Sequence, residues 1–386
     1  MLQRTDRYTT ANYARYPIAF VSGKGCRLTG DDGRDYLDLF AGLAVSSLGH
    51  GHPALVRAIQ AQAEKLIHTS NLFYHEPGAR LAERLVELTF ADRVFFCNSG
   101  AEANEAAIKM ARRASSQSGR YKVVAAHRSF HGRTYGALAA TGQPELREGF
   151  GPMPAGFVHV EPGSAGAVRA AVDGETAAVL VEPIIGEGGV LVPPAGYLRA
   201  LRQICDDAGA ALILDEVQTG NGRTGKLFAY QHEGIEPDIL TTAKGLAGGL
   251  PIGAVLARQG LADCFVPGSH GTTFGANPVA CAAALAVLGE LLEGGVIDNV
   301  VRVGDYLLER LRTRLGGRDD VVDIRGKGFM LGIEFTRETK PMVRELLARG
   351  VITNSTAGNV LRLIPPLILS EAEVDEGVEA IARVLG

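Results

Sequence analysis

The chain has 386 residues, of which 46% are hydrophobic and 21% charged, with a formal net charge of -4. This composition is globular and excludes a disordered chain, and the slightly acidic balance argues against a nucleic-acid-binding protein, which usually presents a basic face. Glycine is frequent, with 49 residues, but it follows no three-residue period, which excludes collagen. The glycines therefore indicate tight turns or close backbone approaches.

The cysteines and the hydropathy pattern bear on location. Five cysteines lie far apart without a C-x-x-C motif, at Cys26, Cys97, Cys205, Cys264 and Cys281. Scattered cysteines in odd number favour reduced thiols, so we expect a cytoplasmic protein. The first residues contain no apolar core of a secretory signal, and the longest uncharged apolar stretch, 279–289, is too short to span a bilayer. We expect no membrane and no nucleic-acid partner.

Short strands joined by turns are expected over residues 15–40. From about residue 55 to 290, short apolar runs alternate with helical patterns. The expected strands are Val94–Cys97, Lys122–Ala126, Ala177–Val181, Ala210–Leu214, Asp238–Thr242 and Ile252–Leu256. The expected helices are Glu102–Ala114, Gly196–Asp207 and Pro278–Leu292. This alternation predicts an α/β fold with a mostly parallel mixed sheet between helices.

The C-terminal part has an α+β pattern. A helix precedes strands near Val321–Phe335, and a second helix, a strand near Val360–Ile364 and a final helix follow. No linker rich in Pro, Gly or Ser separates three units, although three independent domains are the alternative. We predict a large domain of residues 55–290 and a small α+β domain formed by residues 1–54 and 291–386.

Two polar, glycine-containing stretches could hold a phosphate. Residues 98–102 (NSGAE) lie between an expected strand and an expected helix, where small residues let an anion approach free backbone N–H groups. A plain capped helix, with Ser99 as N-cap and Glu102 completing a capping box, explains the same residues. The loop 270–278 offers hydroxyls and N–H groups, or is only a loop.

Two charged residues follow expected buried strands. Asp215 lies at a strand end, where α/β sheets bind ligands, and a buried carboxylate needs a cationic partner. A helix cap or an internal ion pair is the alternative. Lys244 lies between Ala243 and Gly245, and a lysine with a lowered pKa forms Schiff bases with carbonyl compounds. A surface lysine is the alternative there.

The residues 220–225 read G-x-G-x-x-G, the dinucleotide-binding pattern. That motif should join a strand directly to a helix. Here Asp215 and Glu216 come first, and KLFAYQHEG follows without a helical period. A nicotinamide-dependent dehydrogenase therefore remains only as an alternative. The histidines lack the spacing of a metal site, so no metal is expected.

A lysine, an acid and a phosphate-binding helix terminus are together the parts of a pyridoxal phosphate (PLP) site. The ordered segments that carry a wider resemblance are SGAEANEAAIKMAR, SFHGRT, VEPIIGEGGV, LDEVQTGNGRTG, DILTTAKGLAGGLPIGA and HGTTFGANP. This series resembles the class III, or ω-amino-acid, aminotransferases over nearly the whole chain. The resemblance implies the fold of type I PLP-dependent transferases, PLP as cofactor, and a homodimer with shared active sites.

The resemblance also implies which residues bind the cofactor. Lys244 matches the Schiff-base lysine and Asp215 the acid that pairs with the pyridinium nitrogen, which makes these two the catalytic residues. Phe130 matches the aromatic residue that stacks on the ring, Gln218 the contact to the ring hydroxyl, and Thr273 a residue that reaches the phosphate of the neighbouring subunit. The other expected cofactor contacts are Ser99, Gly100, Ala101, Glu182 and Thr272.

Three residues are expected to bind substrate. Arg133 and Arg362 match carboxylate-binding arginines, whose planar fork suits bidentate pairing. Glu187 matches the acid that pairs with Arg362 when no carboxylate occupies it. Two positions depart from the family pattern, since Ile185 stands where Gln is usual and Ala276 where Gly is usual. We expect both to reshape local packing.

Within the class, SNLFYHEP and the compact length resemble the branch that acts on acetylornithine. This implies transfer of the ω-amino group of N-acetylornithine to 2-oxoglutarate, giving N-acetylglutamate 5-semialdehyde and glutamate, a step of arginine biosynthesis. Leu43 stands where enzymes for free ornithine carry a Tyr, and it suits an acylated α-nitrogen. The alternatives are other ω-amine donors (succinylornithine, succinyl-diaminopimelate, acetyl-lysine or 4-aminobutyrate) and a PLP-binding protein without activity.

Overall fold

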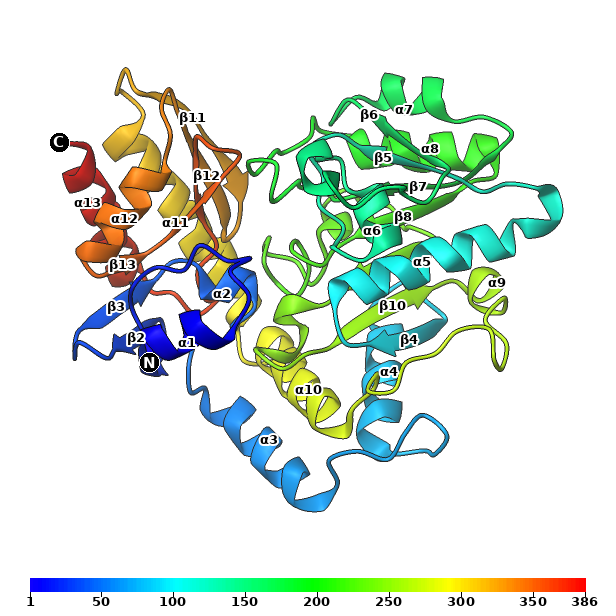
Figure 1. Ribbon diagram of the computed structural model, residues 1–386, viewed down its shortest axis with the longest axis horizontal. Helices are drawn as coiled ribbons and strands as arrows, with labels where there is room; N and C mark the ends of the chain where they lie inside the picture. The colour runs from blue at the N-terminus through cyan, green and yellow to red at the C-terminus, as the bar shows by residue number, and fades with distance from the viewer.

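The computed structural model describes residues 1–386, and its strands form three sheets. A seven-stranded sheet in the order β4-β10-β9-β8-β7-β5-β6 lies in one lobe. Two four-stranded sheets, β1-β2-β3-β13 and β11-β12-β15-β14, lie in the other lobe (Figure 1). The predicted α/β fold, with one larger mixed sheet and a smaller α+β part, is confirmed.

The large sheet is mostly parallel. Its parallel neighbours are β5 (Lys122–Ala126), β6 (Phe157–Val160), β7 (Thr176–Val181), β8 (Ala211–Asp215) and β9 (Ile239–Thr242). Next to β9, β10 (Gly253–Ala257) runs antiparallel to this set. The edge strand β4 (Arg93–Cys97) is antiparallel to β10 and therefore has the same direction as the parallel strands. Every residue of β7 and β8 is buried, as continuous apolar runs require. Six of the strands match the predicted runs, and only the edge strand β6 was missed.

The helices of this lobe are α3 (Pro53–Lys65), α4 (Glu76–Glu87), α5 (Gly100–Ala114), α6 (Tyr135–Ala140), α7 (Ala165–Ala171), α8 (Tyr197–Ala208), α9 (Gln259–Ala262) and α10 (Pro278–Leu292). Among them, α5 and α8 pack against opposite faces of the sheet. Because strand side chains alternate between faces, Val179 and Val181 belong to the core cluster that contains α8. Ala178 and Leu180 belong to the cluster that contains α5. The sheet is thereby packed between one layer that contains α8 and one that contains α5.

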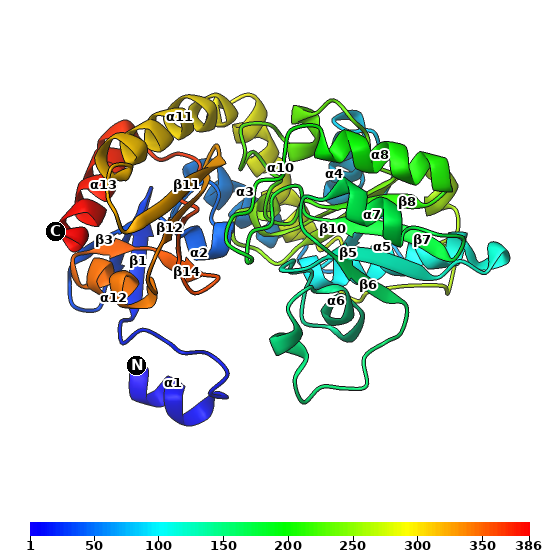
Figure 2. The same ribbon diagram turned by 90° about the horizontal axis from the view of Figure 1, so that it is seen from above.

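The second lobe joins both ends of the chain. Its strands are β1 (Phe20–Lys24), β2 (Arg27–Gly30), β3 (Asp35–Asp38), β11 (Val321–Lys327), β12 (Met330–Phe335), β13 (Val351–Ile352), β14 (Asn354–Thr356) and β15 (Val360–Leu363). Its helices are α1 (Leu2–Tyr8), α2 (Ala41–Ala44), α11 (Val296–Leu315), α12 (Lys340–Ala348) and α13 (Glu371–Leu385). β13 pairs in parallel with β3, so N-terminal and C-terminal residues share one sheet. Figure 2 shows α1 standing clear of the sheets.

No single helix is long and apolar enough to cross a membrane. Only α10 and α11 taken together meet that length and composition, and they are bent by 60° where they meet. Most of α10 is buried inside the protein, where it packs against α3 and α4.

Candidate active site

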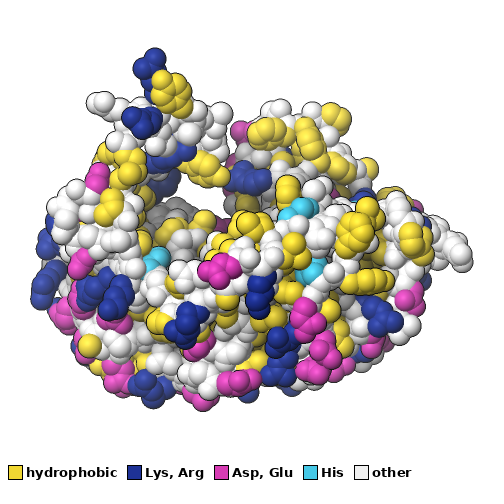
Figure 3. All heavy atoms as spheres, turned by 90° about the horizontal axis from the view of Figure 1, so that it is seen from below, with side chains coloured by type: hydrophobic (Ala, Val, Ile, Leu, Met, Phe, Trp, Pro, Cys, Tyr) yellow, Lys and Arg dark blue, Asp and Glu magenta, His cyan; other side chains and the backbone are white.

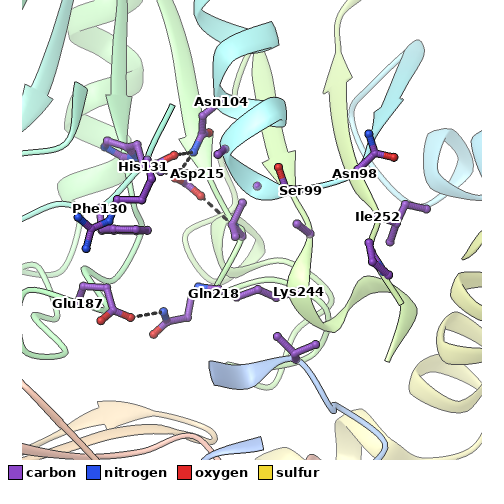
Figure 4. A pocket seen from close by; sticks show the side chains of 18 of the residues that line it. Asn98, Ser99, Asn104, Phe130, His131, Glu187, Asp215, Gln218, Lys244 and Ile252 are labelled. Carbon is purple, nitrogen blue, oxygen red and sulfur yellow. Dashed lines mark hydrogen bonds and ion pairs between the residues drawn. The ribbon is translucent and has the colours of Figure 1, made fainter. Parts of the chain in front are cut away.

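One cavity of about 470 Å³ lies beyond the carboxyl ends of the parallel strands, the edge at which α/β sheets bind ligands. It brings together ten of the expected residues, some of which Figure 4 shows. These are Ser99, Gly100, Ala101, Phe130, Arg133, Glu182, Glu187, Asp215, Gln218 and Lys244. Arg362 lies directly behind the cavity wall, whereas Thr272 and Thr273 do not line the cavity.

Lys244 lies two residues after β9 and begins a short 3-10 helix, Lys244–Ala247 (η4). Its φ is +44°, a left-handed conformation that side chains other than glycine rarely adopt unless their surroundings fix it. Burial, reinforced by the charge of Arg362, lowers the pKa of Lys244 against the opposing effects of Glu187 and Asp215. A lysine with a lowered pKa supplies a nucleophilic amine, so the alternative of a surface lysine is wrong here.

Asp215 is the last residue of β8, and three hydrogen bonds fix its carboxylate. Oδ2 accepts from Asn104 Nδ2 at 2.7 Å and lies 2.8 Å from His131 Nδ1. Oδ1 accepts from the backbone N–H of Val217 at 3.0 Å (Figure 4). Asn104 is itself fixed, because its Oδ1 accepts from Thr241 Oγ1 at 2.7 Å. The carboxylate is therefore rigid and available to a cationic group in the cavity.

Sequence reasoning missed Asn104 and His131. Both are buried, and both also bond to each other, since Asn104 Nδ2 donates to the carbonyl of His131 at 2.7 Å. The available signal was a polar residue among alanines on the buried face of α5, because a buried amide needs partners. His131 follows Phe130 directly, so the SFHGRT segment supplies both a ring and a partner for Asp215.

The N-terminus of α5 opens onto the cavity. Ser99 is the N-cap, and its Oγ accepts from the N–H of Glu102 at 3.2 Å. The carboxylate of Glu102 accepts from the N–H of Asn98 at 2.5 Å, so the expected capping box does not close on Ser99. The helix is capped and its positive end faces the cavity, a combination that suits a phosphate.

Glu187 and Arg362 form an ion pair that joins the two lobes. Arg362, on β15, is 0% exposed and donates to Glu187 Oε1 at 2.6 Å and to Gln218 Oε1 at 3.2 Å. Its Nη2 donates to Asn354 Oδ1 at 2.7 Å. Burial alone would raise the pKa of Glu187, but Arg362 and Lys244 hold it below its usual value. Glu187 is therefore ionised at neutral pH.

Phe130, Arg133 and Glu182 also line the cavity. The guanidinium of Arg133 lies 5.6 Å from the centre of the Phe130 ring. The carboxylate of Glu182 accepts from the N–H of Phe130 at 2.9 Å and from that of Gly186 at 3.0 Å. Burial, followed by the charge of Asp215, raises the pKa of Glu182 to about 7. Both carboxylate oxygens of Glu182 thus accept hydrogen bonds from backbone N–H groups. Its contact with a cofactor stays a prediction.

Thr272 and Thr273 lie on the loop before α10. Thr272 Oγ1 accepts from Asn98 Nδ2 at 3.1 Å, and Thr273 is exposed to solvent. The neighbouring surface is apolar, with exposed Phe73 and Phe274. Figure 3, which views the molecule from below, shows hydrophobic side chains spread over the face of the large lobe and a hollow between the lobes. The role of both threonines stays a prediction.

The G-x-G-x-x-G residues 220–225 do not join a strand to a helix. They form a turn in which Arg223 is buried and donates to the carbonyls of Phe329 and Pro365. Asn221 Nδ2 donates to the carbonyl of Ala243 at 3.1 Å, next to Lys244. The segment connects the lobes and supports the lysine, which is not the geometry of a dinucleotide site.

The two departures from the family pattern have different structural consequences. Ile185 is buried and lines a separate cavity of about 240 Å³ behind Glu182. Ala276 has a φ of +58°, a conformation that Gly adopts without a steric penalty. The expectation that Ala276 acts through packing is therefore incomplete, because it introduces backbone strain as well.

The aminotransferase class-III family model matches residues 8–385. The chain belongs to this family. It is 50% identical over 389 residues to the acetylornithine aminotransferase of Caldanaerobacter subterraneus, with 100% of this chain and 99% of that protein covered. The acetylornithine aminotransferase of Mycobacterium tuberculosis is 50% identical over 392 residues, with 100% and 96% covered. An ornithine aminotransferase structure from Toxoplasma gondii, which has PLP at partial occupancy, matches with a TM-score of 0.95, 35% identity, and 99% and 93% covered.

This class-III aminotransferase is a PLP-dependent transaminase with the fold of type I PLP-dependent transferases, as expected. The dehydrogenase and the inactive binding protein are thereby set aside. The residues of the cavity suit PLP, because a lysine with lowered pKa, a fixed carboxylate and a positive helix end surround one space. The close packing there needs glycine at one point, since Gly132 lines the cavity with a φ of +136°, and a Cβ on it would lie 2.9 Å from the backbone Cα of Ala101.

Proposed function

We propose that this aminotransferase transfers the ω-amino group of N-acetylornithine to 2-oxoglutarate, giving N-acetylglutamate 5-semialdehyde and glutamate in cytoplasmic arginine biosynthesis. The observation that carries the proposal is the cavity that joins Lys244 to an exchangeable ion pair, Glu187–Arg362. Proteins named acetylornithine aminotransferase that are 45–50% identical over nearly the whole chain support the choice of donor.

Different residues of the cavity are assigned to different parts of PLP. We assign the phosphate to the N-terminus of α5 with Ser99, and one face of the ring to Phe130. Gln218 is assigned to the ring hydroxyl. The carboxylate of Asp215, held by Asn104 and His131, keeps a proton on the ring nitrogen.

PLP, when bound, supplies an electrophilic carbon for the amino group and a ring that spreads negative charge from the substrate carbon. Lys244 Nζ is assigned the proton transfers at that carbon, because burial lowers its pKa and favours the neutral amine. Burial of this amine disfavours its charged form and so preserves its basic form.

The two substrates present different charges to the same residues. 2-Oxoglutarate has two carboxylates, and we assign them to Arg133 and Arg362. N-acetylornithine has one, so Arg362 keeps Glu187 as its partner while Arg133 binds the α-carboxylate. Glu187, whose side chain is 28% exposed, can leave the pair, and Arg362 then still has Asn354 and Gln218. A buried guanidinium thus has a partner in both halves of the reaction.

A panel of donors tests the substrate. The PLP-loaded protein is mixed with N-acetylornithine, N-succinylornithine, N-acetyl-lysine, free ornithine or 4-aminobutyrate, and glutamate formed from 2-oxoglutarate is measured. We expect the highest kcat/KM for N-acetylornithine, with free ornithine well below it. A higher value for another donor would assign the enzyme to that donor instead.

We further propose a homodimer with shared active sites and the two-domain division at residues 54/55 and 290/291. The exposed apolar residues Leu72, Phe73 and Phe274, beside the exposed Thr273, support a partner surface. The pairing of β3 with β13 supports a small domain made from both chain ends. Sedimentation of the PLP-loaded protein is expected to give a dimer, and a monomer at micromolar concentration would contradict it.

Shared sites can be tested by mixing subunits. Consider a dimer of one Lys244→Ala subunit and one Thr273→Ala subunit. The two changes fall in the same active site only if each subunit supplies its Thr273 to the site of its partner. Coexpressed, the two variants would then form mixed dimers with one intact and one doubly changed site. Activity above that of either variant dimer is expected, and no recovery would contradict the shared arrangement.

A further inference from the structure

The short helix α2 has the wrong hand for L-amino acids. Four successive residues have positive φ: Ala41 (+48°), Gly42 (+58°), Leu43 (+70°) and Ala44 (+61°). Three of them have a Cβ, which disfavours this conformation. A left-handed turn of this kind persists only where its surroundings over-determine it, and such places concentrate near functional sites.

Asp38 supplies much of that constraint. It ends β3, is 1% exposed, and its Oδ1 accepts from the N–H groups of Phe40 at 2.9 Å and Ala41 at 2.8 Å. Its Oδ2 lies 2.8 Å from His50 Nε2, beyond the other end of the turn. One carboxylate thus fixes the start of the turn and connects it to the segment that leaves it.

The segment that leaves the turn contacts the residue that follows Lys244. Ser47 Oγ donates to the carbonyl of Gly245 at 3.0 Å, and a Cβ on Gly245 would lie 3.5 Å from Ser47 Cβ. Val45 lines the same cavity as Lys244, and the blue ribbon of this segment passes below Lys244 in Figure 4. The carbonyl of Ser47 accepts from the N–H of Leu367 at 2.7 Å. The turn therefore connects the lysine with the C-terminal part of the chain.

We propose that Asp38 is a positioning residue for the aminotransferase reaction. By holding residues 41–44 in the left-handed turn, it places the following Ser47 against the Gly245 carbonyl and so fixes the direction in which Lys244 enters the cavity. Asp38 itself does not line the cavity and acts through the turn. The inference rests on the proposed function, because Lys244 is oriented for that reaction.

The first test places equal backbone strain inside and outside the turn. Gly42 (φ +58°) and Gly33 (φ +77°) both have open space where a Cβ would lie. Gly42→Ala and Gly33→Ala should therefore lower Tm to a similar extent. Only Gly42→Ala should lower kcat with N-acetylornithine, by about 10- to 100-fold, because small misplacements of reacting groups cost that much. Equal kcat in the two variants would overturn the proposal.

The second test follows the lysine segment without substrate. Amide hydrogen exchange of residues 245–248 is measured in the PLP-loaded protein. Ser47→Ala and Asp38→Ala should speed exchange there, and Asp38→Asn, which keeps an acceptor at Oδ1, should fall between Asp38→Ala and the wild type. The matched control is Ser46→Ala, since Ser46 makes no side-chain hydrogen bond to the lysine segment and should leave exchange unchanged.

The outcomes separate this proposal from the proposed function. The positioning role would be overturned if the rate of amide exchange at residues 245–248 were the same in Ser47→Ala, Asp38→Ala and Ser46→Ala. This conclusion would hold whatever the activity of the variants. A wild-type protein that is inactive with N-acetylornithine would overturn the donor assignment while the exchange result still decides the role of Asp38. If Asp38→Ala fails to fold, Ser47→Ala and Gly42→Ala give the answer.

Discussion

The two ends of the cavity are built in different ways. At one end, Asp215 has three hydrogen-bond partners from the lobe of the large sheet, and one of them, Asn104, is itself held. At the other end, Glu187 and Arg362 come from different lobes and meet in a single ion pair. Hydrogen bonds to a buried carboxylate fix its position, whereas an ion pair with a partly exposed partner can be exchanged. The first end suits a cofactor that stays, and the second suits carboxylates that come and go.

The largest effect is expected at the lysine that lies between the two ends. Lys244→Ala should remove turnover, by at least about 10²- to 10⁴-fold from the lost proton transfer alone. It should also change the visible absorbance of bound PLP. The control is Lys226→Ala, since Lys226 is exposed, and it should keep the wild-type rate and spectrum. Wild-type rates in Lys244→Ala would refute the assignment of the lysine.

A smaller loss is expected at the fixed end. Asp215→Asn keeps the shape of the side chain but removes the negative charge, so kcat should fall by about 10²- to 10³-fold in both half-reactions. Rapid-mixing spectra with N-acetylornithine and with glutamate measure the two halves separately. Asp298→Asn, at an exposed position, is the matched control. A loss confined to one half-reaction would show that the two ends do not differ as described.

The exchangeable end should affect discrimination more than rate. Glu187→Gln leaves the charge of Arg362 without a counter-ion, so dicarboxylates are favoured over N-acetylornithine. We expect the ratio of kcat/KM for glutamate to that for N-acetylornithine to rise by about tenfold, equivalent to ~1.4 kcal/mol. Unchanged ratios would show that Glu187 does not act as the exchangeable partner.

A stability change is expected away from the chemistry. Ala276→Gly should relieve the strain of the left-handed conformation, and the greater freedom of Gly in the unfolded chain offsets part of this gain. The free energy of unfolding should rise by up to about 1 kcal/mol. Thermal unfolding of the PLP-loaded proteins measures this change, and kcat is expected to stay the same. A clear drop in Tm would show that packing of the Ala276 methyl group outweighs the strain.

The smallest change is expected from pH. Arg362 and Lys244 hold the pKa of Glu187 below its usual value, so the contribution of its ionised form is present above the ordinary glutamate pKa and is lost only as pH falls through the lower value. The ratio of kcat/KM for glutamate and N-acetylornithine should therefore be flat between about pH 6 and 8. A ratio that titrates within this range would indicate that another group controls discrimination.

The sequence predicted well what depends on local patterns. Buried parallel strands have continuous apolar runs, so β7 and β8 were placed to within one residue. The lysine and the acid were found because a charged residue at the end of such a strand is unusual. The edge strand β6 has partly exposed residues and a histidine, and it lacked that signal.

Other features depend on contacts between distant residues. Asn104 and His131 meet Asp215 only in the folded protein, from 111 and 84 positions away in the chain. The left-handed turn at Gly42 follows from the carboxylate of Asp38 and from packing against Gly245, and no local preference predicts it. The replacement of Gly by Ala276 was visible in the sequence, but its strain required the backbone angle.

The central claim is that one cavity serves an acylated ω-amino donor and a dicarboxylate through a fixed end and an exchangeable end. Its most direct measurement is the single-turnover change in PLP absorbance on mixing the loaded protein with N-acetylornithine, in the wild type and in Glu187→Gln. The wild type should convert fully, and the variant should lose speed with N-acetylornithine while keeping its speed with glutamate. No spectral change with N-acetylornithine, or an equal loss with both substrates, would contradict the claim.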